Sequence, residues 1–410
     1  MKYDLVVVGG GLSGVCAAVA AARHGVKALI IEKSNCLGGT ATNGLFVPFM
    51  PNKAKINGKT VSLNNGIFEE IRKSLEERCA LHYESFLEEE LKLILNHMAK
   101  ESGVDVLFHA SLSKVLKTDK RVDCVSVLTI EGEVKIEADY FIDATGDAQV
   151  AFLANLPFVL GREKDNLTQP MTLSFRVGGV DNERFFSGFN VLNQKYKEAR
   201  EVGEIKNPRE NILVFETPIK GVLHFNSTRV VKKNPTSAWE LSEAEIESRE
   251  QVYELFDFIK KNGQGLENSY ILATGAHIGI RESRKIVGEY TLTEADCVGC
   301  KKFDDAIATC NYDIDIHNPE GTGTSHHYFK DGEYYEIPYR SLIPKNMDNL
   351  LVVGRCISCD HGAEASLRIM PVVSSIGEAG GYAIALAKSQ NVSVSKIDTK
   401  KLKQMINKSI

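Results

Sequence analysis

Residues 3–32 read YDLVVVGGGLSGVCAAVAAARHGVKALIIE, and the order of apolar run, glycine turn, helix and second apolar run in this stretch decides the fold. Residues 5–8 are continuously apolar, as in a strand buried on both faces of a parallel sheet. The alanine-rich residues 15–23 predict a helix, and residues 28–31 predict a second buried strand. Two neighbouring parallel strands joined by a helix follow from this pattern.

The glycines between the first strand and the helix have a spacing that suits phosphate binding. Gly9 allows a tight turn, Gly11 lets a pyrophosphate approach the backbone, and Gly14 lets the helix pack on the strand. Glu32 ends the second strand, where its carboxylate can accept both hydroxyls of an adenosine ribose. Residues 5–22 carry no charge, so a signal peptide or membrane span is an alternative. The three consecutive glycines and the second strand favour dinucleotide binding.

Composition narrows the class of protein. The chain has 410 residues, 43% hydrophobic and 25% charged, which fits a globular protein and excludes disordered and fibrous classes. A net charge of −5 gives no general electrostatic reason for nucleic-acid binding, and we expect none. Nine scattered cysteines, an odd number, suit a reducing compartment. Without a second apolar span, we predict a cytoplasmic protein with no membrane span.

The rest of the chain divides into two parts. Residues 33–44 form a glycine-rich loop that suits close approach to a ligand, residues 104–136 predict a β-meander, and residues 140–147 predict a strand ending in a glycine turn. From about residue 156 the glycine-rich loops stop. Ser242–Glu245 is predicted to be a capping box that opens a helix ending at Gly263. We therefore predict a discontinuous domain, 1–155 and 345–410, with a substrate or cap domain, 156–344, inserted into it.

Several blocks of the chain resemble the FAD-dependent oxidoreductases of the glutathione-reductase-like, two-dinucleotide-binding-domain flavoprotein superfamily. The blocks are residues 9–14 with Glu32, 37–42, 141–147, 279–284, 337–344 and 349–358. The resemblance implies an α/β fold, with a Rossmann-like FAD-binding domain that carries a β-meander and an inserted α+β substrate domain. FAD is favoured over a nicotinamide cofactor because the chain has no second G-x-G-x-x-G unit.

The resemblance also assigns roles along the cofactor. The first glycine loop would hold the pyrophosphate, Gly354 and Arg355 would meet the ribityl-phosphate region, and a helix opening near Pro371 would aim its N-terminus at the isoalloxazine. Such a helix end would stabilise the negative charge of a reduced flavin. The residues expected to bind FAD are Gly9, Gly11, Gly14, Glu32, Lys33, Gly38, Gly39, Thr40, Ala41, Thr42, Ala144, Thr145, Gly146, Gly354, Arg355, Ile376 and Gly377.

Catalytic candidates lie near the expected flavin site. His361 and Arg368 are expected to transfer a proton and orient the substrate, with Arg281 assisting, although either arginine could instead form a structural ion pair. These groups suit a small polar substrate, including an anionic one, that exchanges a hydride with FAD. His326–His327 near Asp315 would permit a metal site, but adjacent histidines in a loop are more often surface groups, and we predict no metal.

Two C-x-x-C pairs leave an alternative open. Cys297, Cys300, Cys356 and Cys359 could form a redox centre of an electron-transfer or thiol-redox flavoprotein subunit that works with a partner protein, although chance spacing is favoured. A nucleotide-binding scaffold without turnover is a third alternative. For the leading hypothesis, an FAD-dependent oxidoreductase, we expect a small-molecule substrate and an electron acceptor or donor that the sequence does not identify. A homo-oligomer is compatible with the sequence.

Overall fold

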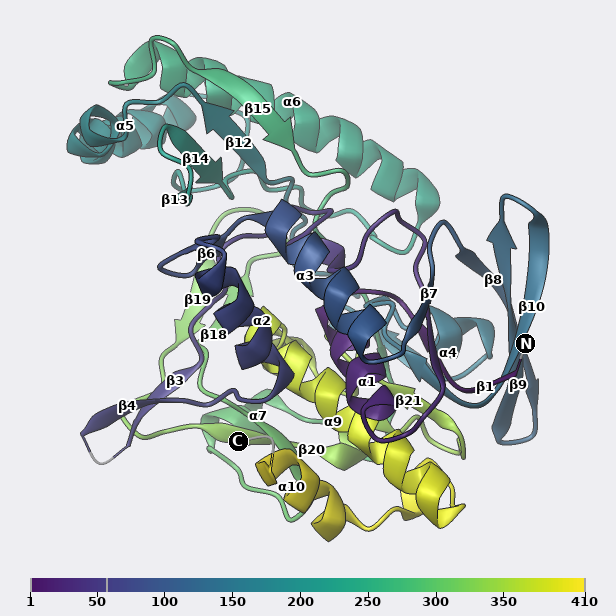
Figure 1. Ribbon diagram of the computed structural model, residues 1–410. Coiled ribbons are helices and arrows are strands. Elements are labelled where there is room, and N and C mark those ends of the chain that lie inside the picture. The colour runs from purple at the N-terminus through teal and green to yellow at the C-terminus, as the bar shows by residue number, and fades with distance from the viewer. Residues whose placement is uncertain (1, 57, 409–410) are drawn as a thin grey trace.

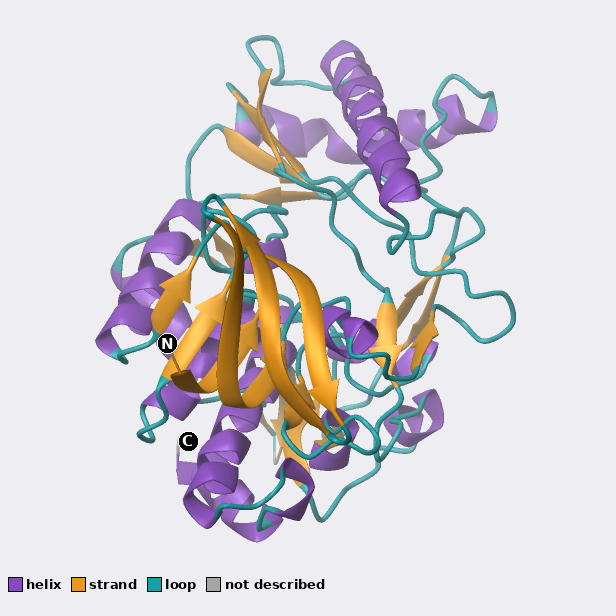
Figure 2. Ribbon diagram, turned by 90° about the vertical axis from the view of Figure 1, so that its right-hand side faces the viewer, coloured by secondary structure: helices purple, strands orange, loops and turns teal. Residues whose placement is uncertain are grey.

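A computed structural model describes residues 2–56 and 58–408, and its main feature is a seven-stranded sheet (Figures 1 and 2). The strands follow the order β7-β2-β1-β10-β9-β8, and β21 pairs with β10. Their bounds are β1 Lys2–Val8, β2 Ala28–Ile31, β7 Asp105–Leu107, β8 Ser111–Thr118, β9 Arg121–Thr129, β10 Gly132–Asp143 and β21 Leu350–Val352. Strands β7, β2, β1, β10 and β21 pair in parallel, as the apolar runs predict.

Strand β10 pairs antiparallel with one neighbour and parallel with another. Its first half pairs antiparallel with β9, which pairs with β8, and this confirms the predicted meander. Its second half pairs in parallel with β1 over residues 137–143. The prediction of a separate strand at residues 140–147 was therefore wrong, because one twelve-residue strand carries both the meander and the parallel sheet.

Helices cover one face of the parallel sheet, with α1 and α9 in the closest contact. The helices on this side are α1 Leu12–Ala22, α2 Ile67–Glu77, α3 Glu88–Glu101, α8 His361–Leu367, α9 Met370–Gln390 and α10 Thr399–Lys408. A side chain at Gly377 of α9 would overlap the Ser13 carbonyl of α1, and one at Gly381 would overlap that of Ala17. Glycine at these positions allows the two helix backbones to touch.

Shorter elements complete this part of the chain. The helices and 3-10 turns are α4 Gln149–Leu153, α7 Glu294–Val298, η1 Gly39–Ala41, η2 Tyr339–Leu342 and η3 Val394–Lys396. The two-stranded sheets are β3 Lys53–Ile56 with β4 Lys59–Ser62, β5 Leu81–His82 with β6 Ser85–Phe86, β11 Phe158–Leu160 with β16 Arg284–Ile286, β17 Ala306–Cys310 with β20 Tyr335–Pro338, and β18 Ile314–His317 with β19 Thr324–His327.

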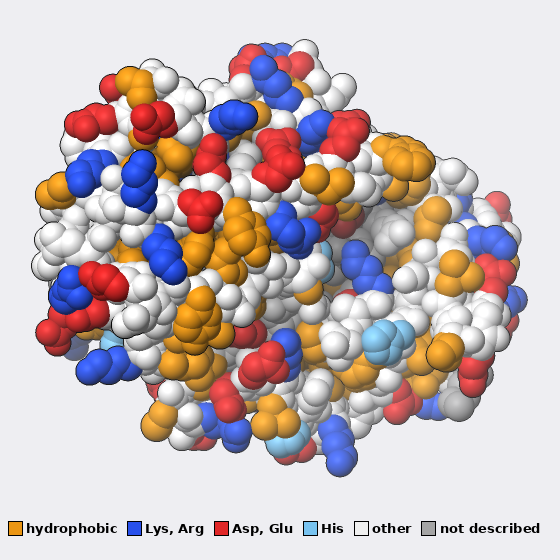
Figure 3. Space-filling model, turned by 90° about the horizontal axis from the view of Figure 1, so that it is seen from above, with side chains coloured by type: hydrophobic (Ala, Val, Ile, Leu, Met, Phe, Trp, Pro, Cys, Tyr) orange, Lys and Arg blue, Asp and Glu red, His pale blue; other side chains and the backbone are white. Residues whose placement is uncertain are grey.

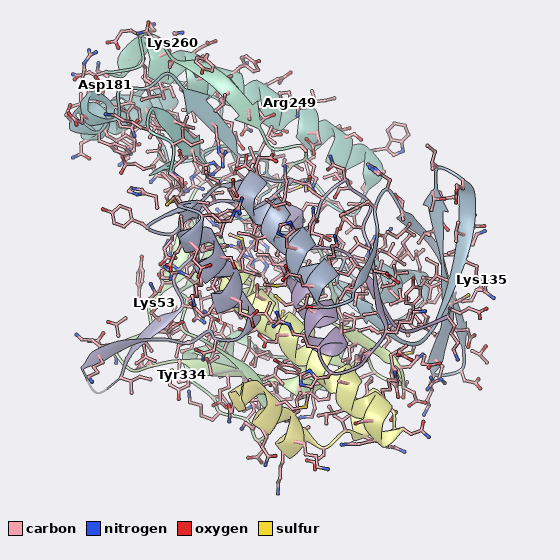
Figure 4. The ribbon with its side chains drawn as sticks, in the orientation of Figure 1. Lys53, Lys135, Asp181, Arg249, Lys260 and Tyr334 are labelled. Carbon is pink, nitrogen blue, oxygen red and sulfur yellow. The ribbon has the colours of Figure 1, made fainter. Side chains whose placement is uncertain are left out.

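A second hydrophobic core, built from residues between Met171 and Ile278, lies above the first in Figure 1. We call residues 171–279 the cap. Its antiparallel sheet has the order β13-β14-β12-β15, and its two long helices lie on this sheet. The cap elements are β12 Phe175–Gly178, α5 Asn182–Glu201, β13 Val214–Glu216, β14 Val222–Phe225, α6 Ala238–Asn262 and β15 Tyr270–Thr274. Arg249 and Lys260 in Figure 4 mark α6, and Asp181 marks the start of α5.

Paired backbone hydrogen bonds close the base of the cap, and contacts that include one buried ion pair tie the cap to the first core. At the neck, where the chain enters and leaves the cap, Thr172 and Gly279 exchange two backbone hydrogen bonds of 3.1 and 2.8 Å. Arg176 on β12 forms a buried ion pair with Glu88 at the start of α3, with Nη1 2.9 Å from Oε1. These contacts hold the cap over the carboxyl ends of the parallel strands.

Helix α6 begins before the predicted capping box. Ser237 is its N-cap and accepts the Glu240 N–H, whereas Ser242 lies inside the helix and donates to the Ala238 carbonyl at 2.7 Å. The predicted start at Ser242 was therefore wrong, and the predicted end at Gly263 is confirmed. Both serines are followed by glutamate three residues later, so the sequence offered two equivalent starts.

The predicted domain boundaries at residues 156 and 344 stay a prediction. Buried residues from Leu292 to Ile343 belong to the first core, so the cap core is shorter than the predicted insertion. Among the described residues no single helix is long and apolar enough to cross a membrane; α8 and α9 pass that test only as a pair, bent by 95°. The cytoplasmic location stays a prediction as well.

Candidate active site

A cavity of about 1050 Å³ runs from the glycine loop after β1 to the underside of the cap. Both parts of the molecule line it. Figure 3, which views the molecule from above the cap, shows a hollow flanked by lysine and arginine side chains. The cavity is therefore the place where a bound nucleotide and a second ligand can meet.

The first glycine loop has the conformation that its spacing predicts. Gly9 has φ +105, and a Cβ there would collide with the Ala144 backbone. A Cβ at Gly14 would overlap the Gly9 carbonyl, so helix α1 packs directly on the loop. At Gly11, by contrast, a Cβ would meet no protein atom within 4 Å. Gly11 lines the cavity, at the N-terminal end of α1, where an anionic group is favoured.

Glu32 is held in place at the end of β2. Its Oε2 accepts the Gly10 N–H at 2.7 Å, and its Oε1 accepts the backbone N–H and the hydroxyl of Ser34 at 2.8 and 2.7 Å. The carboxylate lines the cavity together with Lys33. A fixed carboxylate beside the glycine loop is the arrangement that binds an adenosine ribose.

Most of the residues predicted to bind FAD lie on the cavity wall. Those that line it are Gly9, Gly11, Glu32, Lys33, Gly38, Gly39, Thr40, Ala41, Ala144, Thr145, Gly146, Gly354 and Arg355. Four others do not line it: Gly14, Thr42, Ile376 and Gly377. Thr42 donates its hydroxyl to the Leu37 carbonyl and shapes the loop, while Ile376 and Gly377 are buried where α9 packs on α1. Direct contact of these four with a cofactor stays a prediction.

The start of α9 and Arg355 also form part of the cavity wall. Ile369, the N-cap of α9, and Met370, its first residue, line the cavity, so the positive end of the helix dipole faces it. Arg355 donates from Nη2 to Asp147 Oδ1 at 2.8 Å. The helix therefore begins at the cavity wall, and its contact with the isoalloxazine stays a prediction.

The three predicted catalytic residues separate into two places. Arg281 and Arg368 line the cavity, and His361 does not. His361 Nδ1 lies 2.7 Å from Glu282 Oε2, in a buried cluster with Lys285 and Glu364. His277 and His326 also line the cavity, whereas the guanidinium carbon of Arg284 lies outside it, 4.1 Å from the centre of the Phe152 ring. Proton transfer by His361 stays a prediction, without support from its position.

Arg281 is at the neck of the cap. Its Nη1 donates to the Pro170 carbonyl at 2.7 Å and to Thr172 Oγ1 at 2.6 Å. Arg368 donates from Nη2 to Gln169 Oε1 at 3.2 Å, and its Nε is buried without a hydrogen-bond partner among the described residues. Burial, and then the charge of Arg368, hold the pKa of Arg281 well below its usual value.

Arg209, Arg229 and Tyr312 near these arginines were not predicted from the sequence, and Asp315 was considered only in connection with a metal. Arg209, Tyr312, Asp315 and His317 line the cavity, while Arg229 lies behind them. Burial raises the pKa of Tyr312 to about 12, so the phenol keeps its proton at neutral pH. No local pattern could have identified Arg209, because its role depends on the cap folding back over the first core.

Hydrogen bonds fix the charge state of His317. Arg229 Nη2 lies 3.1 Å from His317 Nδ1, and because arginine only donates, this nitrogen accepts. His317 Nε2 then carries the proton and faces Asp315 Oδ2 at 3.3 Å. Burial, followed by the charge of Arg281, lowers the pKa of His317 to about 3. Burial opposes ionisation of Asp315, but the contact with His317 holds the pKa of Asp315 below its usual range.

The thiols do not gather in one place. All nine cysteines are free, and among the described residues no group of three or more histidine, cysteine or carboxylate side chains could hold a metal ion. Cys297, Cys356 and Cys359 are buried, and burial raises the pKa of each thiol. This arrangement gives no support to the alternative of a four-thiol redox centre.

Comparison with known proteins identifies the family of the chain. Residues 4–406 match the family described as FAD dependent oxidoreductase. The mitochondrial dihydrolipoyl dehydrogenase of Schizosaccharomyces pombe is 31% identical over 159 residues, 35% of this chain and 28% of that enzyme. The glutathione reductase of Debaryomyces hansenii is 52% identical over 48 residues, 12% of this chain and 10% of that enzyme. The chain thus matches less than a third of the length of either relative.

Solved structures align along nearly the whole chain at low identity. A geranylgeranyl bacteriochlorophyll reductase-like protein of Thermoplasma acidophilum aligns with a TM-score of 0.49 and 17% identity, covering 99% of this chain and 83% of that one. The p-nitrophenol 4-monooxygenase PnpA of Pseudomonas putida DLL-E4 aligns with a TM-score of 0.48 and 11% identity, covering 98% and 83%.

The residues present fit FAD. The open space at Gly11 admits a pyrophosphate, the anchored Glu32 carboxylate suits the ribose, and the start of α9 faces the same cavity. The family match confirms the predicted family and cofactor and assigns the chain to the oxidoreductases, and the sheet with its parallel strands confirms the predicted α/β fold class. The chain belongs to the FAD dependent oxidoreductase family, and its cofactor is FAD.

Proposed function

We propose that this protein transfers a hydride between FAD and a small polar substrate held between the flavin site and the cap. The observation that carries the proposal is the single cavity, which joins the glycine loop to polar side chains of the cap and the neck. FAD supplies the hydride chemistry when bound, so the chain's own residues need only bind, orient and exclude water. The electron acceptor or donor is proposed to be a separate molecule.

The residues at the cap end have roles that their contacts support. Arg281 is fixed by Pro170 and Thr172, so its guanidinium is a rigid donor for a polar substrate group. Arg368 comes from the turn before α9 and faces the same space. Tyr312 stays protonated, so its hydroxyl group can donate a hydrogen bond to the substrate. We assign substrate orientation to the two arginines.

The first experiment is the visible spectrum of the purified protein, before and after dithionite and then air. Bands near ~370 and ~450 nm that bleach and return are expected of a redox-active flavin. Anaerobic bleaching by polar metabolites, one class at a time, then tests hydride transfer from a substrate. A protein that stays colourless and takes up no added FAD would refute the proposal. A flavin that is reduced by dithionite, but by no small-molecule substrate, would favour the alternative of a nucleotide-binding scaffold without turnover.

A further inference from the structure

Three arginine side chains at the cap end of the cavity have no carboxylate partner. Arg209 comes from the cap, Arg281 from the neck and Arg368 from the turn before α9, and all three line the cavity. Arg209 and Arg281 are more than nine-tenths buried, and none of the three forms an ion pair with another described residue. The Nε atoms of Arg209 and Arg368 are buried without a hydrogen-bond partner among the described residues.

Of the two neighbouring carboxylates, Glu210 already pairs with another arginine, and Asp315 has one oxygen, Oδ1, that is buried without a hydrogen-bond partner among the described residues. Glu210 Oε1 lies 3.0 Å from Arg229 Nη1 and also accepts the Gly323 N–H. Asp315 faces His317, which is neutral. We call Arg209, Arg229, Arg281, Arg368, Glu210 and Asp315 the arginine cluster. Four guanidinium groups and two carboxylates leave this cluster with two positive charges.

Such an excess is costly for the protein alone. A buried charge without a partner is destabilising, and like charges close together add to the cost. Burial and the neighbouring guanidinium groups disfavour the charged forms of Arg209 and Arg281 and so lower the pKa of both. An anion with two charges would satisfy both the charge and the unpaired N–H groups.

We propose that the arginine cluster binds the substrate through anionic oxygens that carry two negative charges, as two carboxylates of one small molecule or as a single phosphate. The inference rests on the proposed function and names the class of substrate for the same cavity. Guanidinium groups suit both chemistries because their N–H groups form a planar fork that matches carboxylate and phosphate oxygens.

The test is calorimetric titration of the FAD-loaded protein with small probes at neutral pH. Succinate carries two separate carboxylates, inorganic phosphate carries its charge on one group, propionate has one carboxylate and succinamide has none. We expect succinate or phosphate to bind more tightly than propionate and succinamide by about tenfold or more, because propionate can accept fewer charged hydrogen bonds and succinamide carries no charge. Preference for succinate over phosphate identifies a dicarboxylate, and the reverse identifies a phosphate ester.

Variants of Arg209 test whether the cluster is the binding site. R209Q should lower the affinity for the preferred dianion by about tenfold to a hundredfold, whereas R209K, which keeps the charge, should lose less. R184Q is the matched control, because Arg184 is an exposed arginine of α5 that pairs with Glu267 away from the cavity. R184Q should bind the dianion as the wild type does.

The inference and the proposed function can fail separately. FAD content and dithionite reduction of each variant report on the proposed function and do not depend on the anion. The inference is overturned if the protein holds a reducible flavin but neither succinate nor phosphate binds, if succinamide binds as well as succinate, or if R209Q and R184Q bind the dianion equally.

Discussion

Lys285 Nζ lies 3.1 Å from Glu364 Oε2, and both side chains are shut off from solvent. On its other side the ammonium contacts Glu282, which also accepts the Gln169 N–H at 2.9 Å. Gln169 in turn accepts a hydrogen bond from Arg368 on the cavity wall. The ion cluster therefore lies directly behind the residues that would hold the substrate.

Replacing Lys285 with methionine should destabilise the protein by about 3–5 kcal/mol, because Glu282 would then be a buried charge without its cation. Urea unfolding monitored by circular dichroism measures the change. K135M is the control, since Lys135 is an exposed residue of the meander, labelled in Figure 4, and should leave the free energy of unfolding unchanged. Equal stability of K285M and wild type would contradict the prediction.

Glu364 should make the protein less stable as the pH rises. Burial is the main cause that raises the pKa of Glu364 to about 8, so the folded state keeps a proton that the unfolded state releases above about 4.5. Between these values each pH unit should lower the free energy of unfolding by roughly 1 kcal/mol through this group. In E364Q this group no longer titrates. The free energy of unfolding of the wild type should therefore fall relative to that of E364Q as the pH rises from 5 to 8. A difference that does not change with pH would refute the assignment.

Gly11→Ala should weaken FAD binding without harming the fold. Gly11 has φ −65 and a Cβ there would meet no protein atom within 4 Å, so the methyl group would project into the space of the cofactor. We expect about tenfold or greater loss of FAD affinity in fluorescence titrations of the apoprotein, with the same thermal midpoint as wild-type apoprotein. Gly321→Ala, whose Cβ would also be in open space but off the cavity wall, should bind FAD normally.

Native thiols should react in two groups. Cys79 is exposed and Cys300 is half-buried, whereas the other seven cysteines are buried. With a thiol reagent at neutral pH, Cys79 should react fast and Cys300 more slowly, and all nine should react in denaturant. C79S should remove the fast phase. Fewer than nine thiols in denaturant would indicate a disulfide and revive the thiol-redox alternative.

The cofactor half of the molecule was predictable because each of its features depends on a few neighbouring residues. The apolar runs of β1 and β2, the glycine spacing and Glu32 specify a local unit that needs no long-range information. The meander was also predicted, but the continuity of β10 was not, because pairing on one strand switches from β9 to β1 without any break in the sequence.

The substrate half depends on contacts between distant segments. His361 was expected near the flavin because of its place in the chain, yet its side chain faces Glu282, and the sequence does not reveal which side of the start of α8 turns towards the cavity. Arg209 approaches Arg281 only because residues 171–279 fold back over the first core. The same distance along the chain hides the ion cluster around Lys285.

The pairing of Thr172 with Gly279 means that the chain enters and leaves the cap at one point. A gene segment encoding the cap could therefore be exchanged by recombination between related genes with both junctions kept in register. Such an exchange would replace Arg209 but keep Arg281 and Arg368, which lie outside the segment. Evolution could change substrate preference in one step in this way, while the part that binds the dinucleotide is inherited intact.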